Sequence, residues 1–209
     1  MAFEMLQVRA VSRAAIADLI LHRHYAKRWP SISFAFGLFN NNDLIGAVSY
    51  GTPSSAPLRA GLLGKDHADW VLELNRLCLV NNAKNEASFL ISKSLKMLPQ
   101  PSAIISFADI SQGHTGYVYQ ACNFLYCGLS AKRTDWKVKG MEHLHGQTIA
   151  DKFRGVSNRA QAMRDEYGDS FYLAPRPRKH RYVFFAGTRA MRKQMKSLLR
   201  YPVLPYPKG

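Results

Sequence analysis

The stretch 103-AIISFADISQGHTGYVYQACNFLYCGL-129 is the part of the chain that decides the fold class. Its first residues, Ala103–Ala108, form a short apolar run typical of a buried strand, and Asp109 stands at the carboxyl end of that run. Helical spacing over Gly113–Asn123 predicts a helix, and Phe124–Leu129 predicts a further strand. A strand, a helix and a strand in immediate succession indicate an α/β protein.

The segments before this stretch carry strand and helix signals of the same kinds. Ser12 can cap a helix whose apolar residues recur at helical spacing, and the four residues 40-NNND-43 are typical of a turn between two antiparallel strands. The elements expected here are a strand at 5–11, a helix from 12 to about 25, a hairpin of strands 32–39 and 44–50, a strand at 70–80 and a helix at 87–97.

The pattern weakens beyond Ala131 into a polar, basic insertion, and it recovers in a strand at Tyr182–Ala186 and a basic helix at Arg189–Leu199. We therefore expect one α/β (α+β) domain with a mixed central sheet flanked by helices. Residues 1–130 form its core, and residues 131–209 form a basic extension that completes the sheet.

The charge balance indicates a polyanionic partner. The 209 residues include 29 Lys and Arg but 14 Asp and Glu, so the formal net charge is +15. Nucleic acid is the partner favoured, since clustered cations displace counterions from phosphates, and neither a lipidation signal nor a Lys-rich amphipathic helix points to a membrane. A charged surface kept for solubility is the alternative. No long apolar stretch resembles a signal peptide, and the three cysteines lack metal-site spacing, so we expect a cytoplasmic protein with reduced thiols.

The segment 22-HRHYAKRWP-30 is the first candidate site. It combines imidazole, phenol, exposed indole and cationic groups, which together suit gripping phosphates and stacking an extruded base. A solvated basic helix end is the alternative. The residues concerned are His24, Tyr25, Lys27, Arg28 and Trp29.

The charged residues Glu73 and Arg76 interrupt an otherwise apolar strand and form the second candidate. Strand alternation places Glu73 and Asn75 on one face and Arg76 on the other. Charges embedded in this way are often functional, and a buried structural ion pair is the alternative.

Asp109 is the third candidate, because a carboxylate at a strand end facing a helix suits a base or a metal ligand. With His24 and His114 it could complete a site of two histidines and one carboxylate for iron; a helix-capping role is the alternative. Ser88, near the start of the helix at 87–97, could hold an anionic donor or act as a cap.

The order of elements resembles that of the GNAT acetyltransferases, and the segment 117-YVYQACNF-124 is similar to a helix-to-strand junction of that family. The resemblance implies a GNAT-like fold over most of residues 5–130. The family holds the coenzyme A pyrophosphate on a glycine-rich loop, whereas 81-NNAKNE-86 contains no glycine. We therefore leave the small-molecule donor open between acetyl-CoA and another compound.

A narrower resemblance is to the phage Mom family. It rests on several motifs in order: His24-Tyr25 with Lys27-Arg28 and Pro30, 34–39, 50-YGTP-53, 73-ELNRL-77, Ala108-Asp109, 113-GHTG-116 and 119-YQACNF-124. The family is known for converting the N6 amino group of adenine in DNA to a carbamoylmethyl-amino group, which protects phage DNA from restriction, and Fe(II) has been implicated. By motif, the resemblance implies catalytic roles for His24, Tyr25, Arg76, Ser88, Asp109 and Tyr119, supported by Glu73 and His114.

Double-stranded DNA is the partner that this resemblance implies. A base inside a duplex is unreachable, so flipping is required, and the basic segments would grip the surrounding phosphates. The residues expected to do so, besides Lys27, Arg28 and Trp29, are Lys132, Arg133, Arg178, Lys179 and Arg181. A coenzyme A-dependent N-acyltransferase and a non-enzymatic basic DNA-binding protein are the competing functions. The oligomeric state is left open, a dimer included.

Overall fold

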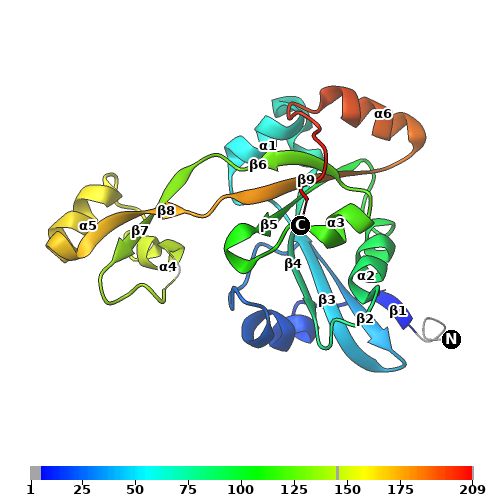
Figure 1. Ribbon diagram of the computed structural model, residues 1–209, viewed down its shortest axis with the longest axis horizontal. Coiled ribbons are helices and arrows are strands. Elements are labelled where there is room, and N and C mark those ends of the chain that lie inside the picture. The colour runs from blue at the N-terminus through cyan, green and yellow to red at the C-terminus, as the bar shows by residue number, and fades with distance from the viewer. Residues whose placement is uncertain (1–5, 145, 209) are drawn as a thin grey trace. The chain divides into compact units, whose positions relative to one another are not determined.

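A computed structural model describes residues 6–144 and 146–208 and divides the chain into two compact units. The first unit comprises residues 1–129 and 179–209, and the second unit comprises residues 130–178. Each unit contains a β-sheet of its own (Figure 1). Residues 179–209, which were expected to form one extension together with residues 131–178, belong to the first unit.

A seven-stranded mixed sheet forms the centre of the first unit, in the order β1-β2-β3-β4-β5-β9-β6. Neighbouring strands are antiparallel except for β4 and β5, which run parallel. This confirms the expected α/β class and mixed central sheet. The strands are β1 (Leu6–Ala10), β2 (Phe34–Asn40), β3 (Asp43–Gly51), β4 (Val71–Leu79), β5 (Ser102–Asp109), β6 (Leu125–Leu129) and β9 (Lys179–Ala186). Met5, with which the first strand was expected to begin, lies outside the described residues.

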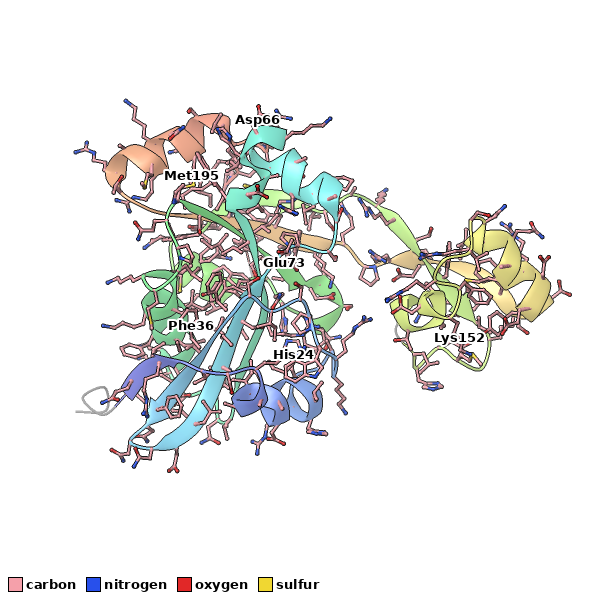
Figure 2. All side chains as sticks on the ribbon, turned by 180° about the vertical axis from the view of Figure 1, so that it is seen from behind. His24, Phe36, Asp66, Glu73, Lys152 and Met195 are labelled. Carbon is pink, nitrogen blue, oxygen red and sulfur yellow. The ribbon has the colours of Figure 1, made fainter. Side chains whose placement is uncertain are left out.

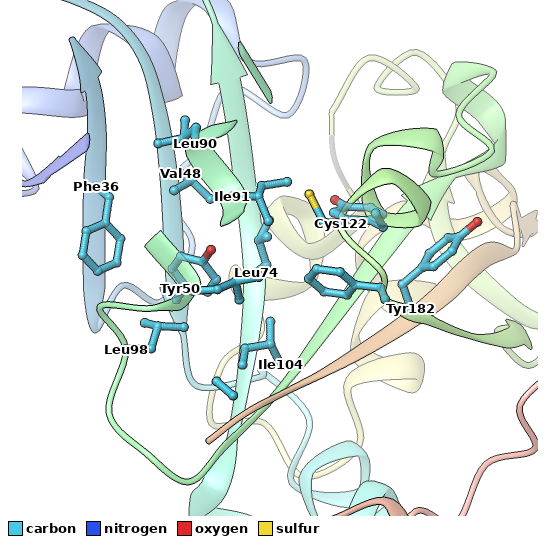
Figure 3. Close-up of a cluster of buried hydrophobic side chains, with 14 of the residues drawn as sticks. Phe36, Val48, Tyr50, Leu74, Leu90, Ile91, Leu98, Ile104, Cys122 and Tyr182 are labelled. Carbon is cyan, nitrogen blue, oxygen red and sulfur yellow. The ribbon is translucent and has the colours of Figure 1, made fainter. Parts of the chain in front are cut away.

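Helices cover both faces of this sheet. Alternate residues of β5 pack into two different hydrophobic clusters, each with its own helices. Ile104 packs with α2 (Glu86–Leu95) and α3 (Tyr117–Ala121), the cluster drawn in Figure 3. Its neighbours Ala103 and Ile105 pack on the other face with α1 (Ala56–Leu63) and α6 (Arg189–Leu198). The buried side chains Leu90, Ile91, Leu62 and Met195 anchor these helices to the sheet.

Two expected helices are shorter or less regular than the sequence pattern indicated. The first is a 3-10 turn at Ala14–Ile16 followed by a π-helical turn, η2, at Leu19–Arg23; Ser12 accepts the Ala15 N–H as expected. The expected helix at 113–123 contracts to α3, because Gly116 has a left-handed φ of 82° and cannot continue a helix. A Cβ at that position would collide with the ring of Tyr182, so the break is built into the packing.

The sequence pattern did not reveal α1, which begins after Ser55 and carries Pro57 in its first turn. A 3-10 segment, η3, follows at Lys65–Trp70. Within the described residues, no helix combines the length and apolar character needed to cross a bilayer.

The second unit has a small core of its own, which corrects the expectation of a patternless insertion. The strands β7 (Arg133–Val138) and β8 (Phe171–Arg176) pair antiparallel, and α4 (Gly146–Asp151), α5 (Arg159–Tyr167) and the 3-10 turn Gly168–Ser170 lie between them in the chain. Its core consists of Val138, Ile149, Phe153 and Met163.

Candidate functional site

A pocket of about 610 Å³ opens in the first unit where β4 and β5 cease to pair. Their parallel register runs from Val71↔Ala103 to Leu74↔Ser106, and both strands then continue separately past the pocket. Figure 2 shows His24 and Glu73 in this region, with Met195 of α6 at the far end of the first unit. The lining residues are Arg23, His24, Tyr25, 73–79, Asn82, Ala87, Phe107, Ala108, 113–119 and Lys179.

A β-bulge in β4 brings Glu73 and Arg76 to the same face of the strand. Ser49 is paired with Arg76 and Tyr50 with Leu74, so Asn75 is an extra residue in the ladder. Leu74 and the later residues Leu77 and Leu79 consequently all pack into the α2 cluster. The expectation that Arg76 lies opposite Glu73 was wrong, because simple alternation cannot register an inserted residue.

Glu73 and Arg76 are half-buried side chains of opposite charge within the lining, and each influences the pKa of the other. Burial raises the pKa of the Glu73 carboxyl, against the opposing effect of Arg76 and Lys179. Burial likewise lowers the pKa of Arg76, although the neighbouring Tyr25 and Glu73 oppose that shift. The guanidinium donates to the carbonyl oxygens of Asn75 at 2.6 Å and Arg28 at 3.2 Å. Glu73 is therefore the carboxylate whose proton affinity is adjusted by this site.

His24 is a neutral imidazole held in one tautomer. It follows η2 and is 8% exposed; burial, with contributions from Arg76 and His114, lowers its pKa to about 4. Its Nδ1 accepts the backbone N–H of Ala26 at 3.1 Å. Because a neutral imidazole has one acceptor and one donor nitrogen, Nε2 carries the proton. His24 thus offers a hydrogen-bond donor at neutral pH, which differs from the base or metal-ligand role expected from the sequence.

Tyr25 supplies an exposed aromatic surface beside the pocket. Its ring is 49% exposed, stacks on His24 at 4.4 Å between centroids and meets His114 edge to face at 6.2 Å. Trp29 was expected to expose its indole, but the ring is half-buried. It lies beneath the guanidinium of Arg13 and packs against the cluster that contains Ile16. Tyr25 is accordingly the better stacking surface of the two.

Tyr119 forms the inner wall of the pocket from α3. It packs against Phe124 and Tyr182, and its side chain is hydrogen-bonded to Ser106 of β5. Burial raises the pKa of its phenol to about 12, so it remains protonated at neutral pH. Tyr119 therefore suits packing and hydrogen bonding rather than service as a phenolate.

Asp109 adjoins the pocket but is absent from its lining. One oxygen lies 2.8 Å from Lys179 Nζ, and the other accepts the N–H and hydroxyl of Ser111, capping the 3-10 turn Ile110–Gln112. Burial alone would raise its pKa, yet these partners together lower it. The capping alternative is thus realised, and the residue that projects from this pair into the pocket is Lys179.

The residues expected to bind iron do not form a ligand set. His24 and His114 line the pocket, but Asp109 is engaged by Lys179 and Ser111. Among the described residues, no three His, Cys, Asp or Glu side chains gather as metal ligands would. The ligand set His24, Asp109 and His114 therefore does not fit this arrangement, while a need for iron stays a prediction.

Several remaining candidates lie outside the lining. Ser88 in the first turn of α2 donates its hydroxyl to the Asn85 carbonyl at 3.1 Å. Arg181 lies over Tyr201 and donates to the Cys127 carbonyl at 3.3 Å, which is a structural role on the α6 side of the sheet. Lys27 is exposed close to the pocket residue Tyr25.

Three expected DNA contacts belong to the second unit: Lys132 and Arg133, which are exposed, and Arg178, which donates to the Ser130 carbonyl at 2.6 Å. Their role in DNA binding stays a prediction.

The cysteines behave as expected of small packing residues. Cys122 and Cys127 are buried and Cys78 is half-buried, and burial raises the pKa of each thiol, that of Cys127 to about 11. A protonated, enclosed thiol is a poor nucleophile.

Asn75 is the important residue that sequence reasoning missed. Its amide joins two other segments, since Oδ1 accepts the Ser49 hydroxyl at 2.7 Å and Nδ2 donates to the Ser31 carbonyl at 2.6 Å. The available signal was a polar residue directly between an apolar and a charged position within a strand, which is compatible with a bulge but does not specify one.

Comparison with known proteins agrees with the motif resemblance. A model of the Mom protein family matches residues 5–208. The methylcarbamoylase Mom of Escherichia phage Mu is 32% identical over 216 aligned positions, covering 97% of this chain and 84% of the phage protein.

Solved acetyltransferases show a more distant likeness. A putative acetyltransferase from Salmonella typhimurium, solved with acetyl-CoA, is 10% identical with a TM-score of 0.49, covering 90% of this chain and 98% of its own. Spermidine N-acetyltransferase from Vibrio cholerae is 12% identical with a TM-score of 0.48, covering 87% and 96%.

The family model spans nearly the whole chain, both units included, and the identity with the phage Mu protein extends over the same length. This chain belongs to the Mom protein family.

Proposed function

We propose that this protein is a DNA-modifying transferase that attaches a carbamoylmethyl group to the N6 amino group of adenine, in the host cytoplasm, and so protects phage DNA from restriction. The relative in phage Mu is a methylcarbamoylase. The observation that carries the proposal is the pocket itself, in which an exposed Tyr25 ring lies beside the half-buried, oppositely charged side chains of Glu73 and Arg76. Its volume of about 610 Å³ is within the range of roughly 300–1,000 Å³ typical of ligand sites.

The substrate base would enter the pocket as a flipped nucleotide, because adenine N6 inside a duplex is not accessible to a carboxylate that lies within a pocket. Tyr25 offers the stacking surface, and its support by His24 on one side fixes the ring. Arg23 and Lys27 are exposed and stand two residues before and after Tyr25 in the sequence. Their positive charges suit binding of the phosphates next to the flipped base. Base recognition and phosphate contact are thus both available from the segment that ends η2.

Glu73 is the group best suited to accept the proton. Adenine N6 is a weak nucleophile, and when it attacks the methylene carbon of a carbamoylmethyl donor, the N6–carbon bond forms, the carbon–leaving-group bond breaks and an N6 proton must depart. A carboxylate with a raised pKa is a better base than an ordinary one. His24 can donate from Nε2 to the donor's carbonyl oxygen, and Arg76 can neutralise negative charge on the donor. Fe(II) and acetyl-CoA stay predictions, and no step above depends on either.

The test is mass spectrometry of nucleosides from the DNA of cells that express the chain. A deoxyadenosine heavier by one carbamoylmethyl group is expected with the wild type, and Glu73→Gln should reduce it at least tenfold while DNA binding persists. Glu142→Gln, an exposed glutamate of the second unit, is the matched control.

Other outcomes would favour the competing functions. Acetyl transfer from isotope-labelled acetyl-CoA to an amine would favour a coenzyme A-dependent N-acyltransferase. DNA binding by the wild type with unmodified nucleosides would favour a non-enzymatic DNA-binding protein and refute the proposal.

A further inference from the structure

Asn75 connects the two halves of the pocket. One half is β4, which carries Glu73 and Arg76, and the other is the segment after η2, which carries His24 and Tyr25. The side chain of Asn75 reaches from the bulge to the carbonyl of Ser31, at the far end of that second segment. Its amide oxygen is held at the same time by the fully buried hydroxyl of Ser49 on β3.

The segment around Ser31 lies tightly against β3. Ser33 N–H donates to the Tyr50 carbonyl at 2.8 Å, and a Cβ at Gly51 would collide with the carbonyl of Ser31. This close approach leaves the Ser31 carbonyl directed at Asn75. An amide fits here because it offers one acceptor for Ser49 and one donor for Ser31, a combination that neither a carboxylate nor an aliphatic side chain provides.

Arg76 depends on both connections. Its Nη1 donates to the backbone carbonyl of Asn75, and its Nη2 donates to the carbonyl of Arg28, within the segment that Asn75 holds. If the bulge relaxed into regular pairing, Arg76 would turn to the opposite face and leave Glu73. Both acceptors that orient the guanidinium would then move together.

From this geometry we infer that Asn75 is a positioning residue for Arg76: its amide holds the β4 bulge and the 24–31 segment in register, so that Arg76, Glu73 and His24 face one pocket. The inference rests on the proposed function for its kinetic consequence, but its structural consequence is independent. Asn75 lines the pocket, and the role inferred for it is exerted through Arg76.

Asn75→Leu preserves the approximate shape and removes both hydrogen bonds. We expect the turnover number for DNA modification to fall about 10- to 100-fold, since misplacement by about 1 Å can cost that much, while KM for DNA changes less than threefold. In an Arg76→Ala background the same substitution should cost less than about threefold, because residues that act through one another are not additive. Asn42→Leu, in the exposed turn between β2 and β3, is the matched control.

Equal losses from Asn75→Leu in both backgrounds would overturn the inference, as would an unchanged turnover number. Hydrogen exchange provides a readout without activity: Asn75→Leu should accelerate exchange in residues 24–33 and leave α6 and the second unit as in the wild type. If the wild type does not modify DNA, the proposed function fails, and unchanged exchange at 24–33 would separately refute the positioning role.

Discussion

The folded protein should lose stability in mild acid because His24 is buried, and replacing His24 should remove that loss. Folding lowers the pKa of His24 from 6.5 to about 4, chiefly through burial. The unfolded chain therefore takes up a proton at this residue below pH 6.5, whereas the folded chain resists it until about pH 4. Stability from this group is fully present above pH 6.5 and is lost progressively as the pH falls to 4.

The size of the effect follows from the two pKa values. At roughly 1.4 kcal/mol per pKa unit, the complete loss is up to about 3.5 kcal/mol, and the loss at pH 5 is about 2 kcal/mol. His24→Asn removes the titration and retains an oxygen that can accept the Ala26 N–H. The wild type should therefore lose about 2 kcal/mol more than His24→Asn between pH 7.5 and pH 5.

Urea denaturation at the two pH values measures this difference. Trp29 and Trp70 belong to the first unit and Trp136 to the second, so a Trp136→Phe background makes fluorescence report the unit that contains His24. His22→Asn, an exposed neighbour in η2, should follow the wild type. A difference between wild type and His24→Asn below about 0.5 kcal/mol would refute the claim that burial keeps His24 neutral.

Three further variants, one of them a double substitution, examine the ion pair, the sheet packing and the basic helix. Lys179→Met removes the partner that lies 2.8 Å from Asp109, whose pKa is lowered by that contact and by Ser111. A carboxyl group whose pKa is lowered by folding stabilises the protein above its unfolded pKa. The loss of stability, measured by urea denaturation, should therefore be present at pH 7 and shrink towards pH 3. Met195→Ala empties a fully buried site beneath α6 and should cost about 2–5 kcal/mol by the same assay, with a loss below 1 kcal/mol contradicting the packing. Reversing the exposed Lys193 and Lys196 of α6 to Glu should weaken duplex binding in fluorescence anisotropy and reduce the slope of log affinity against log salt by about 2, whereas an unchanged slope would exclude α6 from the DNA contact.

Strong local patterns in the sequence predicted most elements of the first unit. The hairpin of β2 and β3 followed from β-rich runs around an Asn-rich turn, and β5 from a short, mainly apolar run. The helix at 113–123 was overestimated because its spacing was helical throughout, while the backbone conformation of Gly116 is decided by the nearby Tyr182 ring. The second unit was missed because its few apolar residues form a small core from distant segments.

The sequence by itself determined the α/β class, the cationic surface and the residue types available for chemistry, since these depend on composition and local periodicity. Tertiary structure alone decided which of those residues share a pocket. The bulge at Asn75 places Arg76 on the same face of β4 as Glu73. Lys179, which comes from a remote segment of the chain, forms an ion pair with Asp109. Each outcome depends on contacts between segments far apart in the chain, and no periodicity within one segment encodes such a contact.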